Sequence, residues 1–276
     1  MEDFGYYNGT FAPIGELSIR LSDRAIYFGD GIYDAAIGRN GRISFESEHI
    51  ERFLRNAKRL EIRHSLTHES LSALLHEVID RAGIPQFFLY FQMSRAAERR
   101  IHSYGEENGS NLLITVSPFS ENDIKKELDV ITREDLRYYY CDVKTLNLLP
   151  SVLASADARR AGCDEAIFIR GKFVTECAHS NVFILKDKTL YTHPTDNLIL
   201  PGITRRHFID VARELGIKTV ESPFPFCELM RADEVIITST TKHARLVKTL
   251  DGAKIGGRDR ASGELLCSAL RDKVWK

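Results

Sequence analysis

The sequence predicts a two-domain α+β protein, and three observations support this fold class. The chain has 276 residues, a length that suits one large domain or two modest ones. Strand-like and helix-like segments occur in both halves of the chain. Between the halves, residues 118–123 are polar and turn-prone, which indicates a linker. We therefore expect an N-terminal α+β domain over residues 1–117 and a C-terminal α+β domain over residues 124–276.

The N-terminal half is expected to contain two β-hairpins and two further strands. Asn8-Gly9 and Asn40-Gly41 each separate two β-prone segments. Asn-Gly adopts the positive φ angles that a two-residue loop requires, so both sites predict tight hairpin turns. Residues 87–93 and 111–116 are rich in aromatic and β-branched side chains, which predicts a strand in each.

Two helices are expected in the same half. The first starts at Ser47, which can cap it, because apolar residues then follow at helical spacing as far as Leu60. The second runs from His68 to Ala82, and Gly83 stops it.

The C-terminal half alternates predicted strands with helices. Pro150 fits the first turn of a helix, where a missing N–H costs little. Gly162 and Gly216 each follow an apolar helical pattern and are expected to end it. Helices are expected at residues 149–161, 203–215 and 262–274. Strands are expected at residues 128–132, 137–143, 165–169, 173–175, 181–185, 189–192 and 234–238.

The composition excludes several classes of protein. Hydrophobic residues make up 43% of the chain, enough to bury a core. Lys and Arg number 38 and Asp and Glu 39, so the net charge of -1 argues against a nucleic-acid binder. No apolar run approaches the ~20 residues that span a membrane, and residues 1–7 lack signal-peptide features. Five widely spaced cysteines with no CxxC pair indicate reduced thiols and a cytoplasmic protein. No metal-ligand motif is present, so no metal is expected.

Six stretches could carry chemistry, and the first contains a single lysine. Lys144 lies between a predicted strand and an apolar helix. Buried lysines are scarce, because desolvating an ammonium is expensive. The positive end of the following helix favours the neutral amine, which is the form that attacks a carbonyl in Schiff-base chemistry. The alternative is a surface lysine at a strand end, or one paired with Asp142.

Two loops could bind a phosphate. Pro201-Gly202-Ile203-Thr204 opens a helix, where backbone N–H groups converge. Thr238-Ser239-Thr240-Thr241 leaves an apolar strand with four hydroxyl groups. An ordinary capped helix and a plain Ser/Thr turn are the alternatives, and neither loop has the Walker spacing.

Three further stretches carry charged groups. Glu176, between two strands, could pair with a cationic ring nitrogen. Arg100 and His102, two apart on an extended segment, share a face and could grip a carboxylate together. A solvated glutamate and a basic surface loop are the alternatives. The sixth stretch, residues 28–34 (FGDGIYD), is a glycine-rich turn that leads into a strand.

Taken in order, these six stretches resemble the fold type IV pyridoxal-phosphate enzymes, and among these most closely the D-amino acid aminotransferases. The similarity runs from about Tyr7 to the last predicted helix. It implies two α+β domains with pyridoxal 5′-phosphate in the cleft between them, and a homodimer. It also implies ping-pong transfer of an amino group between a D-amino acid (D-alanine, D-glutamate or D-aspartate) and a 2-oxo acid.

The same resemblance implies roles for individual residues. Lys144 would hold the cofactor as a Schiff base and act as general base and then acid. Glu176 would face the pyridine nitrogen and keep it protonated. Tyr33, Arg100 and His102 would hold the substrate carboxylate, the last two from the neighbouring subunit. The remaining cofactor contacts, most of them to the phosphate, would be made by Arg52, Ile203, Thr204, Ser239 and Thr240.

The sequence departs from the family pattern at three places. Cys177-Ala178-His179-Ser180 stands where glycine followed by serines is common, so two usual hydroxyl groups are missing. Lys242-His243 replaces a more usual polar-acidic pair, and Asp34 stands where Glu is common. Arg99 beside Arg100 adds positive charge, the basis of a hypothesis that acidic substrates are accepted.

Several alternatives share the fold. They are a branched-chain L-aminotransferase, an (R)-selective amine transaminase and an aminodeoxychorismate lyase. Arg100-Ile101-His102 favours the D-amino acid interpretation over all three. The non-enzyme alternatives are a pyridoxal-phosphate-binding module without turnover and a structural protein that uses the fold for dimerisation.

Overall fold

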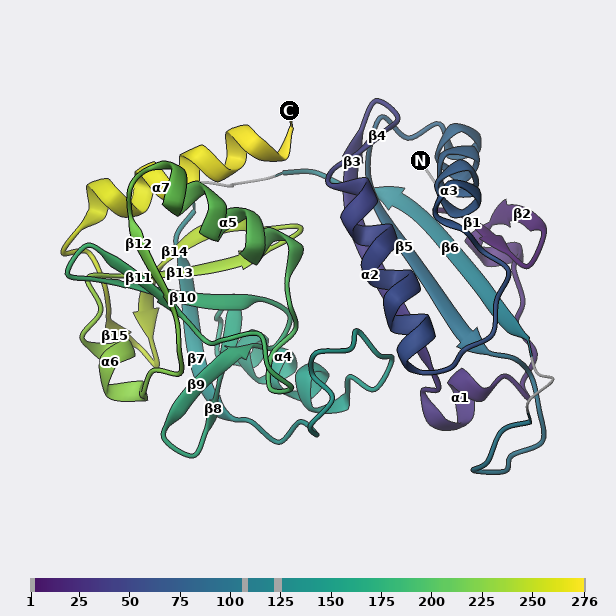
Figure 1. The fold of residues 1–276 in the computed structure, drawn as a ribbon, viewed down its shortest axis with the longest axis horizontal. Helices are drawn as coiled ribbons and strands as arrows, with labels where there is room; N and C mark the ends of the chain where they lie inside the picture. The colour runs from purple at the N-terminus through teal and green to yellow at the C-terminus, as the bar shows by residue number, and fades with distance from the viewer. Residues whose placement is uncertain (1–2, 106–108, 122–125, 276) are drawn as a thin grey trace. The chain divides into compact units, whose positions relative to one another are not determined.

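The computed structural model describes residues 3–105, 109–121 and 126–275 (Figure 1). The chain divides into two compact units, which we call unit 1 and unit 2. Unit 1 comprises residues 1–121 and 143–147, and unit 2 comprises residues 122–142 and 148–276. The first change of unit falls within the expected linker at residues 118–123, of which 122 and 123 lie outside the described residues.

Unit 1 is a six-stranded antiparallel sheet covered by two helices (Figure 1). Both predicted hairpins are confirmed, because Tyr7 pairs with Thr10 and Arg39 pairs with Arg42. Helices α2 (Glu46–Arg59) and α3 (His68–Ala82) pack against the sheet, and α3 ends at Gly83 as expected. The short helices η1 (Ile14–Glu16) and α1 (Arg24–Phe28) precede β3 in the chain. In spatial order the strands are β2 (Thr10–Pro13), β1 (Phe4–Tyr7), β6 (Ser110–Pro118), β5 (Gln86–Arg95), β3 (Gly31–Arg39) and β4 (Arg42–Ile43).

The predicted cap of the first long helix is wrong. Helix α2 begins at Glu46, and its N-cap is Phe45, which has a φ of 51° and no capping side-chain bond. Ser47 already lies inside the first turn. Its hydroxyl bonds instead to Glu51 Oε1 at 3.1 Å and to His68 Nε2 at 3.0 Å, so it ties α2 to the start of α3.

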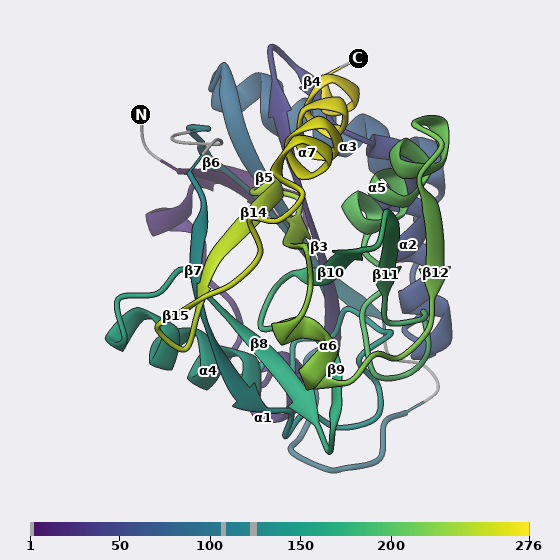
Figure 2. The same cartoon turned by 90° about the vertical axis from the view of Figure 1, so that its left-hand side faces the viewer.

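Unit 2 is built on a mixed sheet with four helices around it (Figures 1 and 2). In spatial order the strands are β12 (Lys218–Glu221), β11 (Thr189–Thr192), β10 (Asn181–Lys186), β13 (Glu234–Ser239), β14 (His243–Leu250), β7 (Leu128–Glu134), β8 (Glu165–Arg170) and β9 (Phe173–Cys177), with β15 (Ala253–Lys254) paired to β14. Helices α5 (Ile203–Glu214) and α7 (Arg260–Val274) contact each other and strands β13 and β14. Helix α4 (Leu149–Arg160) packs on β7 and β8, and α6 (Phe226–Met230) contacts β9.

The predicted strand at residues 137–143 is wrong. Strand β7 ends at Glu134, and residues 137–143 form turns and bends. The carboxylate of Asp135 accepts the backbone N–H of Arg137 at 3.2 Å. Such a local bond turns the chain and competes with continued strand pairing. The segment therefore leaves the sheet just where the side chain of Arg137 turns inward.

The segment that carries Lys144 belongs to unit 1, whereas we expected the C-terminal domain to carry this lysine. Tyr33 N–H donates to the Lys144 carbonyl at 2.9 Å, and Leu146 N–H donates to the Gly31 carbonyl at 3.1 Å. Strand β4 pairs only with the far end of β3, so this end of β3 is open to a short extra partner. Backbone hydrogen bonds to β3 thus fix the position of Lys144 in unit 1.

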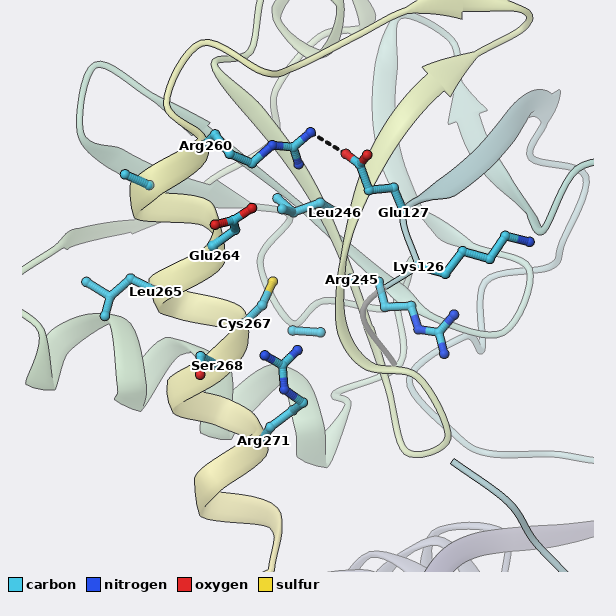
Figure 3. Close-up of a pocket in the computed structure, with 12 residues that line it drawn as sticks. Lys126, Glu127, Arg245, Leu246, Arg260, Glu264, Leu265, Cys267, Ser268 and Arg271 are labelled. Atoms are coloured by element: carbon cyan, nitrogen blue, oxygen red, sulfur yellow. Dashed lines mark hydrogen bonds and ion pairs between the residues drawn. The ribbon is translucent and has the colours of Figure 1, made fainter. Parts of the chain in front are cut away.

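A cavity of about 750 Å³ lies in unit 2 between α7, β14 and residues 126–127 (Figure 3). Arg260 of α7 bonds to Glu127 at its edge, and Arg245 and Arg271 also line it. None of the residues singled out from the sequence lines this cavity. The candidate functional residues therefore lie outside this cavity.

All five cysteines lie in the described part of the chain and are free thiols. Within residues 3–105, 109–121 and 126–275, no helix combines the length and the apolar character that a membrane crossing needs. The same residues contain no group of three or more side chains suited to bind a metal ion.

Gly38 offers a test of the packing in unit 1. A Cβ at this position would lie 2.1 Å from Cζ of Phe87 and 2.6 Å from the carbonyl oxygen of Arg42. We expect Gly38→Ala to lower the free energy of unfolding by about 1–3 kcal/mol, the usual cost of overpacking a core. Urea unfolding measures the change. Gly15→Ala is the control, because its Cβ meets nothing within 4 Å. Equal losses in both variants would contradict the packing described here.

Candidate active site

Lys144 and Tyr33 lie together at the start of strand β3. The Nζ atom of Lys144 is 4.3 Å from the centre of the Tyr33 ring. The Tyr33 ring in turn stacks on Tyr90, with 5.5 Å between ring centres. An ammonium group over the face of an aromatic ring is attracted to it. Two residues that the sequence singled out for different roles are therefore neighbours in unit 1.

The next residue along β3, Asp34, is the centre of a buried ion cluster. Its carboxylate, which is fully buried, accepts two hydrogen bonds from Arg52, at 2.8 and 2.7 Å, and contacts Nδ1 of His49 at 2.7 Å. Burial by itself raises the pKa of Asp34, but Arg52 and His49 outweigh burial and hold this pKa well below its ordinary value. Burial lowers the pKa of His49. Arg52, expected at a phosphate, thus uses two of its nitrogen atoms to bind Asp34.

His49 was not anticipated from the sequence, although a signal exists. His49, Arg52 and Asn56 lie at positions i, i+3 and i+7 of α2, and all three are buried beside Phe53. Polar residues at that spacing share the apolar face of a helix. Because buried polar groups need partners, such a row predicts a buried polar cluster.

Arg100 and His102 meet at one aromatic ring. The guanidinium of Arg100 is 5.4 Å from the centre of the Phe28 ring, and the His102 ring is also 5.4 Å from it. Both side chains are exposed. Arg100 and His102, expected to act together, therefore do share one position in unit 1, and both contact Phe28 of the glycine-rich stretch.

A buried arginine, Arg24, holds the loop that carries Arg100 and His102. Arg24 donates to the carbonyl oxygens of Ile101 at 2.7 Å, His102 at 3.1 Å and Ser103 at 3.3 Å. Its Nε donates to Asp30 at 2.8 Å. Arg24 comes from α1 and was not anticipated, because no short motif marks it. The glycine-rich stretch and the Arg-x-His stretch are thus parts of one structure.

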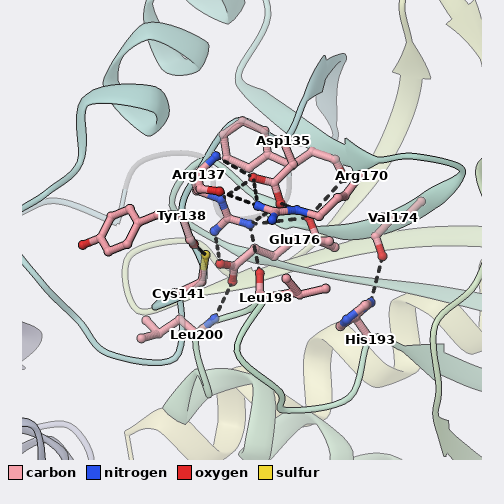
Figure 4. Close-up of polar contacts among 12 residues, drawn as sticks. Asp135, Arg137, Tyr138, Cys141, Arg170, Val174, Glu176, His193, Leu198 and Leu200 are labelled. Atoms are coloured by element: carbon pink, nitrogen blue, oxygen red, sulfur yellow. Dashed lines mark hydrogen bonds and ion pairs between the residues drawn. The ribbon is translucent and has the colours of Figure 1, made fainter. Parts of the chain in front are cut away.

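In unit 2, Glu176 is buried at the end of strand β9 (Figure 4). One carboxylate oxygen bonds to Nη1 of Arg137. The other accepts from Asn181 Nδ2 at 2.9 Å and from the backbone N–H of Leu200 at 3.0 Å. Burial raises the pKa of Glu176 to about 7, although Arg137 and the Leu200 N–H act to lower it. A further positive charge beside this carboxyl would therefore stabilise its ionised form.

Arg137 links Glu176 to a second carboxylate (Figure 4). Its guanidinium also bonds to Asp135 and donates to the Leu198 carbonyl at 3.0 Å. Asp135 accepts a further bond from Thr175 at 2.9 Å and an ion pair from Arg170 at 3.1 Å. Burial raises the pKa of Asp135, but Arg137, Arg170 and Thr175 lower it to about 2. Because a strand was expected over residues 137–143, nothing in the sequence singled out Arg137 as a partner of Glu176.

Asn181 joins three of the sequence stretches. Besides Glu176, its amide donates to the Leu200 carbonyl at 2.9 Å. It pairs in register with Thr238 of β13. A Cβ added to Gly202 would lie 2.1 Å from Asn181 Oδ1, so only glycine allows this close approach. The Glu176 turn, the Gly202 turn and the hydroxyl loop therefore converge in unit 2.

Both loops that are expected to bind a phosphate contain hydrogen-bond donors. Helix α5 starts at Ile203 with no side-chain cap, and the first N–H groups of a helix have no acceptor within it. Ile203 and Thr204 are buried, whereas Ser239 and Thr240 are partly exposed. Thr238 is 1% exposed, and its hydroxyl lacks a hydrogen-bond partner among the described residues. These groups fit an anion such as a phosphate.

The chemistry of the donors fits the cofactor that the sequence implies. Unit 2 offers an uncapped helix start and hydroxyl groups for a phosphate, and a buried carboxylate that favours a nearby cation, as a protonated pyridine nitrogen would be. Unit 1 offers a half-buried primary amine, Lys144, for an aldehyde. Each of these groups was singled out for the same role from the sequence.

Residues 31–250 of the chain match the protein family described as amino-transferase class IV. The D-alanine aminotransferase of Listeria innocua is 36% identical over 258 residues, 92% of this chain and 89% of the relative. The D-alanine aminotransferase of Bacillus licheniformis is 36% identical over 254 residues, 91% of this chain and 89% of the relative.

Solved structures share the fold. The branched-chain aminotransferase of the archaeon Thermoproteus uzoniensis, solved with norvaline, is similar with a TM-score of 0.89. The similarity covers 99% of this chain and 95% of that one, at 22% identity. It therefore describes the architecture and not the substrate.

The pKa of Glu176 generates a prediction about stability. Because the pKa in the folded protein, about 7, exceeds its ordinary value of 4.5, the folded state holds this proton more tightly. The contribution of Glu176 to stability is therefore complete below pH 4.5 and is lost as the pH rises through 7. We expect the stability of the unmodified protein relative to Glu176→Gln to fall by up to about 3 kcal/mol over this range.

Urea unfolding at several pH values, without added ligand, measures this difference. Glu77→Gln is the control, since the Glu77 carboxyl is half exposed on α3 and pairs with Arg81. A difference between Glu176→Gln and the unmodified protein that stays constant from pH 4.5 to 7.5 would show that burial does not govern this carboxyl.

Proposed function

Because this chain belongs to the class IV aminotransferase family, it is a pyridoxal-phosphate-dependent aminotransferase, and we propose that its amino donors are D-amino acids of the D-alanine, D-glutamate or D-aspartate type. The acceptor is a 2-oxo acid. The observation that carries this proposal is the 34–36% identity, over about nine-tenths of the chain, to proteins named D-alanine aminotransferase. The neighbouring side chains of Arg100 and His102 support a substrate with a carboxylate.

The residues assigned to the cofactor are those that the sequence singled out. Lys144 would bind the aldehyde, and Glu176, which Arg137 and Asn181 keep in place, would accept a hydrogen bond from the protonated ring nitrogen. The groups assigned to the phosphate and its surroundings are Arg52, Ile203, Thr204, Ser239 and Thr240. When bound, pyridoxal phosphate supplies an aldehyde that reacts with amines and a ring that accepts the electron pair left on the substrate carbon.

Lys144 moves the proton in this mechanism. Its neutral amine takes the proton from the substrate Cα as general base and gives a proton back as general acid. Tyr33, Arg100 and His102 hold the substrate carboxylate and so orient the Cα–H bond. Because Lys144 approaches from one side only, this orientation decides which enantiomer reacts. Amino acid and oxo acid use the same site in turn, which gives ping-pong kinetics.

A substrate comparison tests the D-amino acid proposal. With 2-oxoglutarate as acceptor, D-alanine is expected to yield pyruvate, and L-leucine little product. Coupled lactate dehydrogenase measures the pyruvate, and chiral chromatography identifies the glutamate enantiomer. Faster turnover of L-leucine would favour a branched-chain enzyme instead. Holo-protein whose absorbance does not change with excess D-alanine would indicate a binding module without turnover.

We also propose a homodimer in which Arg100 and His102 complete the neighbouring subunit's site. Both side chains are exposed, as a contribution to another subunit requires. Lys144→Ala is expected to abolish turnover, and Arg100→Ala is expected to raise the KM for D-alanine by about 10- to 100-fold through the lost ion pair. Mixing the two variants and allowing subunits to exchange is expected to restore about a quarter of the activity at low substrate, since half of the dimers then contain one intact site.

The mixing experiment has clear controls. Arg99→Ala is the matched variant, because Arg99 is the exposed neighbour of Arg100. Its KM for D-alanine is expected to stay unchanged, whereas its rate with D-glutamate falls if Arg99 favours acidic substrates. No recovery on mixing, in dimers shown by light scattering to have exchanged, would mean that Arg100 serves its own subunit.

A further inference from the structure

Two departures from the family pattern contact each other in unit 2. His179 comes from the turn after Glu176, and Lys242 comes from the loop between β13 and β14. Both approach one oxygen of Glu165, at the start of β8: Lys242 Nζ lies 3.0 Å from Oε2 and His179 Nε2 lies 3.1 Å from it. Lys242 Nζ also donates to the Asp164 carbonyl at 3.3 Å. Two substitutions far apart in the sequence thus form one charged cluster.

The cluster is built around a buried charge. The Glu165 side chain is completely buried, and that of Lys242 is only 16% exposed. Burial raises the pKa of Glu165, but His179 and Lys242 outweigh it and lower this pKa to about 2. The carboxylate is therefore an anion at neutral pH, and it needs a cation beside it.

Lys242 is the constant cationic partner of Glu165. Nε2 of His179 lies 3.1 Å from both Glu165 Oε2 and Lys242 Nζ. A ring nitrogen carries either a hydrogen or a lone pair, so it donates to Glu165 or accepts from Lys242, but not both at once. Lys242, with three N–H donors, can serve Glu165, His179 and the Asp164 carbonyl together.

The ion pair ties together two loops that carry proposed cofactor contacts. The backbone N–H of Lys242 donates to the Ser239 hydroxyl at 3.2 Å, so Lys242 closes the loop that contains Ser239 and Thr240. The Ser180 hydroxyl donates to the same Glu165 oxygen at 2.8 Å. Glu165 therefore holds the hydroxyl loop through Lys242 and the Glu176 turn through Ser180.

We propose that Lys242, held by the buried Glu165 carboxylate, is a positioning residue that keeps the Ser239–Thr240 loop in place to bind the phosphate of the cofactor. This inference rests on the proposed assignment of Ser239 and Thr240 to the phosphate. Donors that are already ordered bind an anion more tightly, because binding then does not have to order the loop. Lys242 acts through the loop and does not touch the phosphate itself.

The test compares two forms of the cofactor. Apo-protein is titrated with pyridoxal 5′-phosphate and with pyridoxal, which has the aldehyde but no phosphate, and both dissociation constants are measured by absorbance. The unmodified protein is expected to bind the phosphorylated form more tightly. In Lys242→Met this preference is expected to fall by about tenfold, the effect of one charge-assisted hydrogen bond. Lys242→Arg keeps an ion pair and is expected to restore most of the preference.

A second variant separates positioning from folding. Lys242→Met leaves Glu165 buried without its main cation, whereas the double variant Glu165→Gln/Lys242→Met removes both charges and the link between the loops. We expect the double variant to unfold close to the unmodified protein in urea and still to lose the preference for the phosphate. Lys248→Met is the matched control, because Lys248 lies on β14, the strand that follows Lys242, is 45% exposed and pairs with Asp129.

The outcomes are distinguishable. If Lys242→Met weakens binding of both compounds equally, or if it keeps the full preference, Lys242 does not position the phosphate loop and the inference is overturned. If the unmodified protein itself does not prefer the phosphorylated form, the assignment of the loop to the phosphate fails as well. Neither result depends on whether the amino donor is a D- or an L-amino acid.

Discussion

The arrangement of unit 2 depends on the partners that surround one buried carboxyl group, that of Glu176. Burial favours the protonated form and raises the pKa to about 7, whereas Arg137, Asn181 and the Leu200 N–H bond to the ionised form. Arg137 also bonds to Asp135, two residues earlier in the chain. Because this bond turns the backbone, strand β7 ends at Glu134 and turns follow it. The irregular backbone at this place follows from the electrostatics of the site.

The regular part of the fold could be predicted from local sequence, and the ion pairs could not. Asn8-Gly9, Gly83 and Pro150 act within a few residues of themselves, so hairpins and helix ends follow from them. Arg137 illustrates the opposite case. Its neighbours suit a strand, and its partner Glu176 is 39 positions away in the chain. Nothing in the local pattern distinguishes a side chain that turns inward to a distant carboxylate.

The residues of the candidate site also divide into those that a short sequence marks and those that only the folded chain reveals. Lys144, Glu176 and the two hydroxyl-rich and glycine-containing loops are recognisable because each has a distinctive short sequence. Most of their supporting residues are not, since a buried Arg24 or Arg137 is known only by its contacts; His49 is the exception, because it belongs to a row of polar residues at helical spacing. The departures at His179 and Lys242 were visible one by one. Their contact, across 63 positions, needed the folded chain.

The way Arg24 holds residues 101–103 has an evolutionary consequence. It bonds to the main-chain carbonyl oxygens of these three residues, and it pairs with the Glu98 carboxylate, earlier in the loop, at 3.8 Å. Any amino acid at positions 101–103 offers the same carbonyl group, so these three bonds do not depend on the side chains displayed there. Mutations at Arg100 and His102 can therefore change which molecules are selected while the scaffold beneath them is inherited intact.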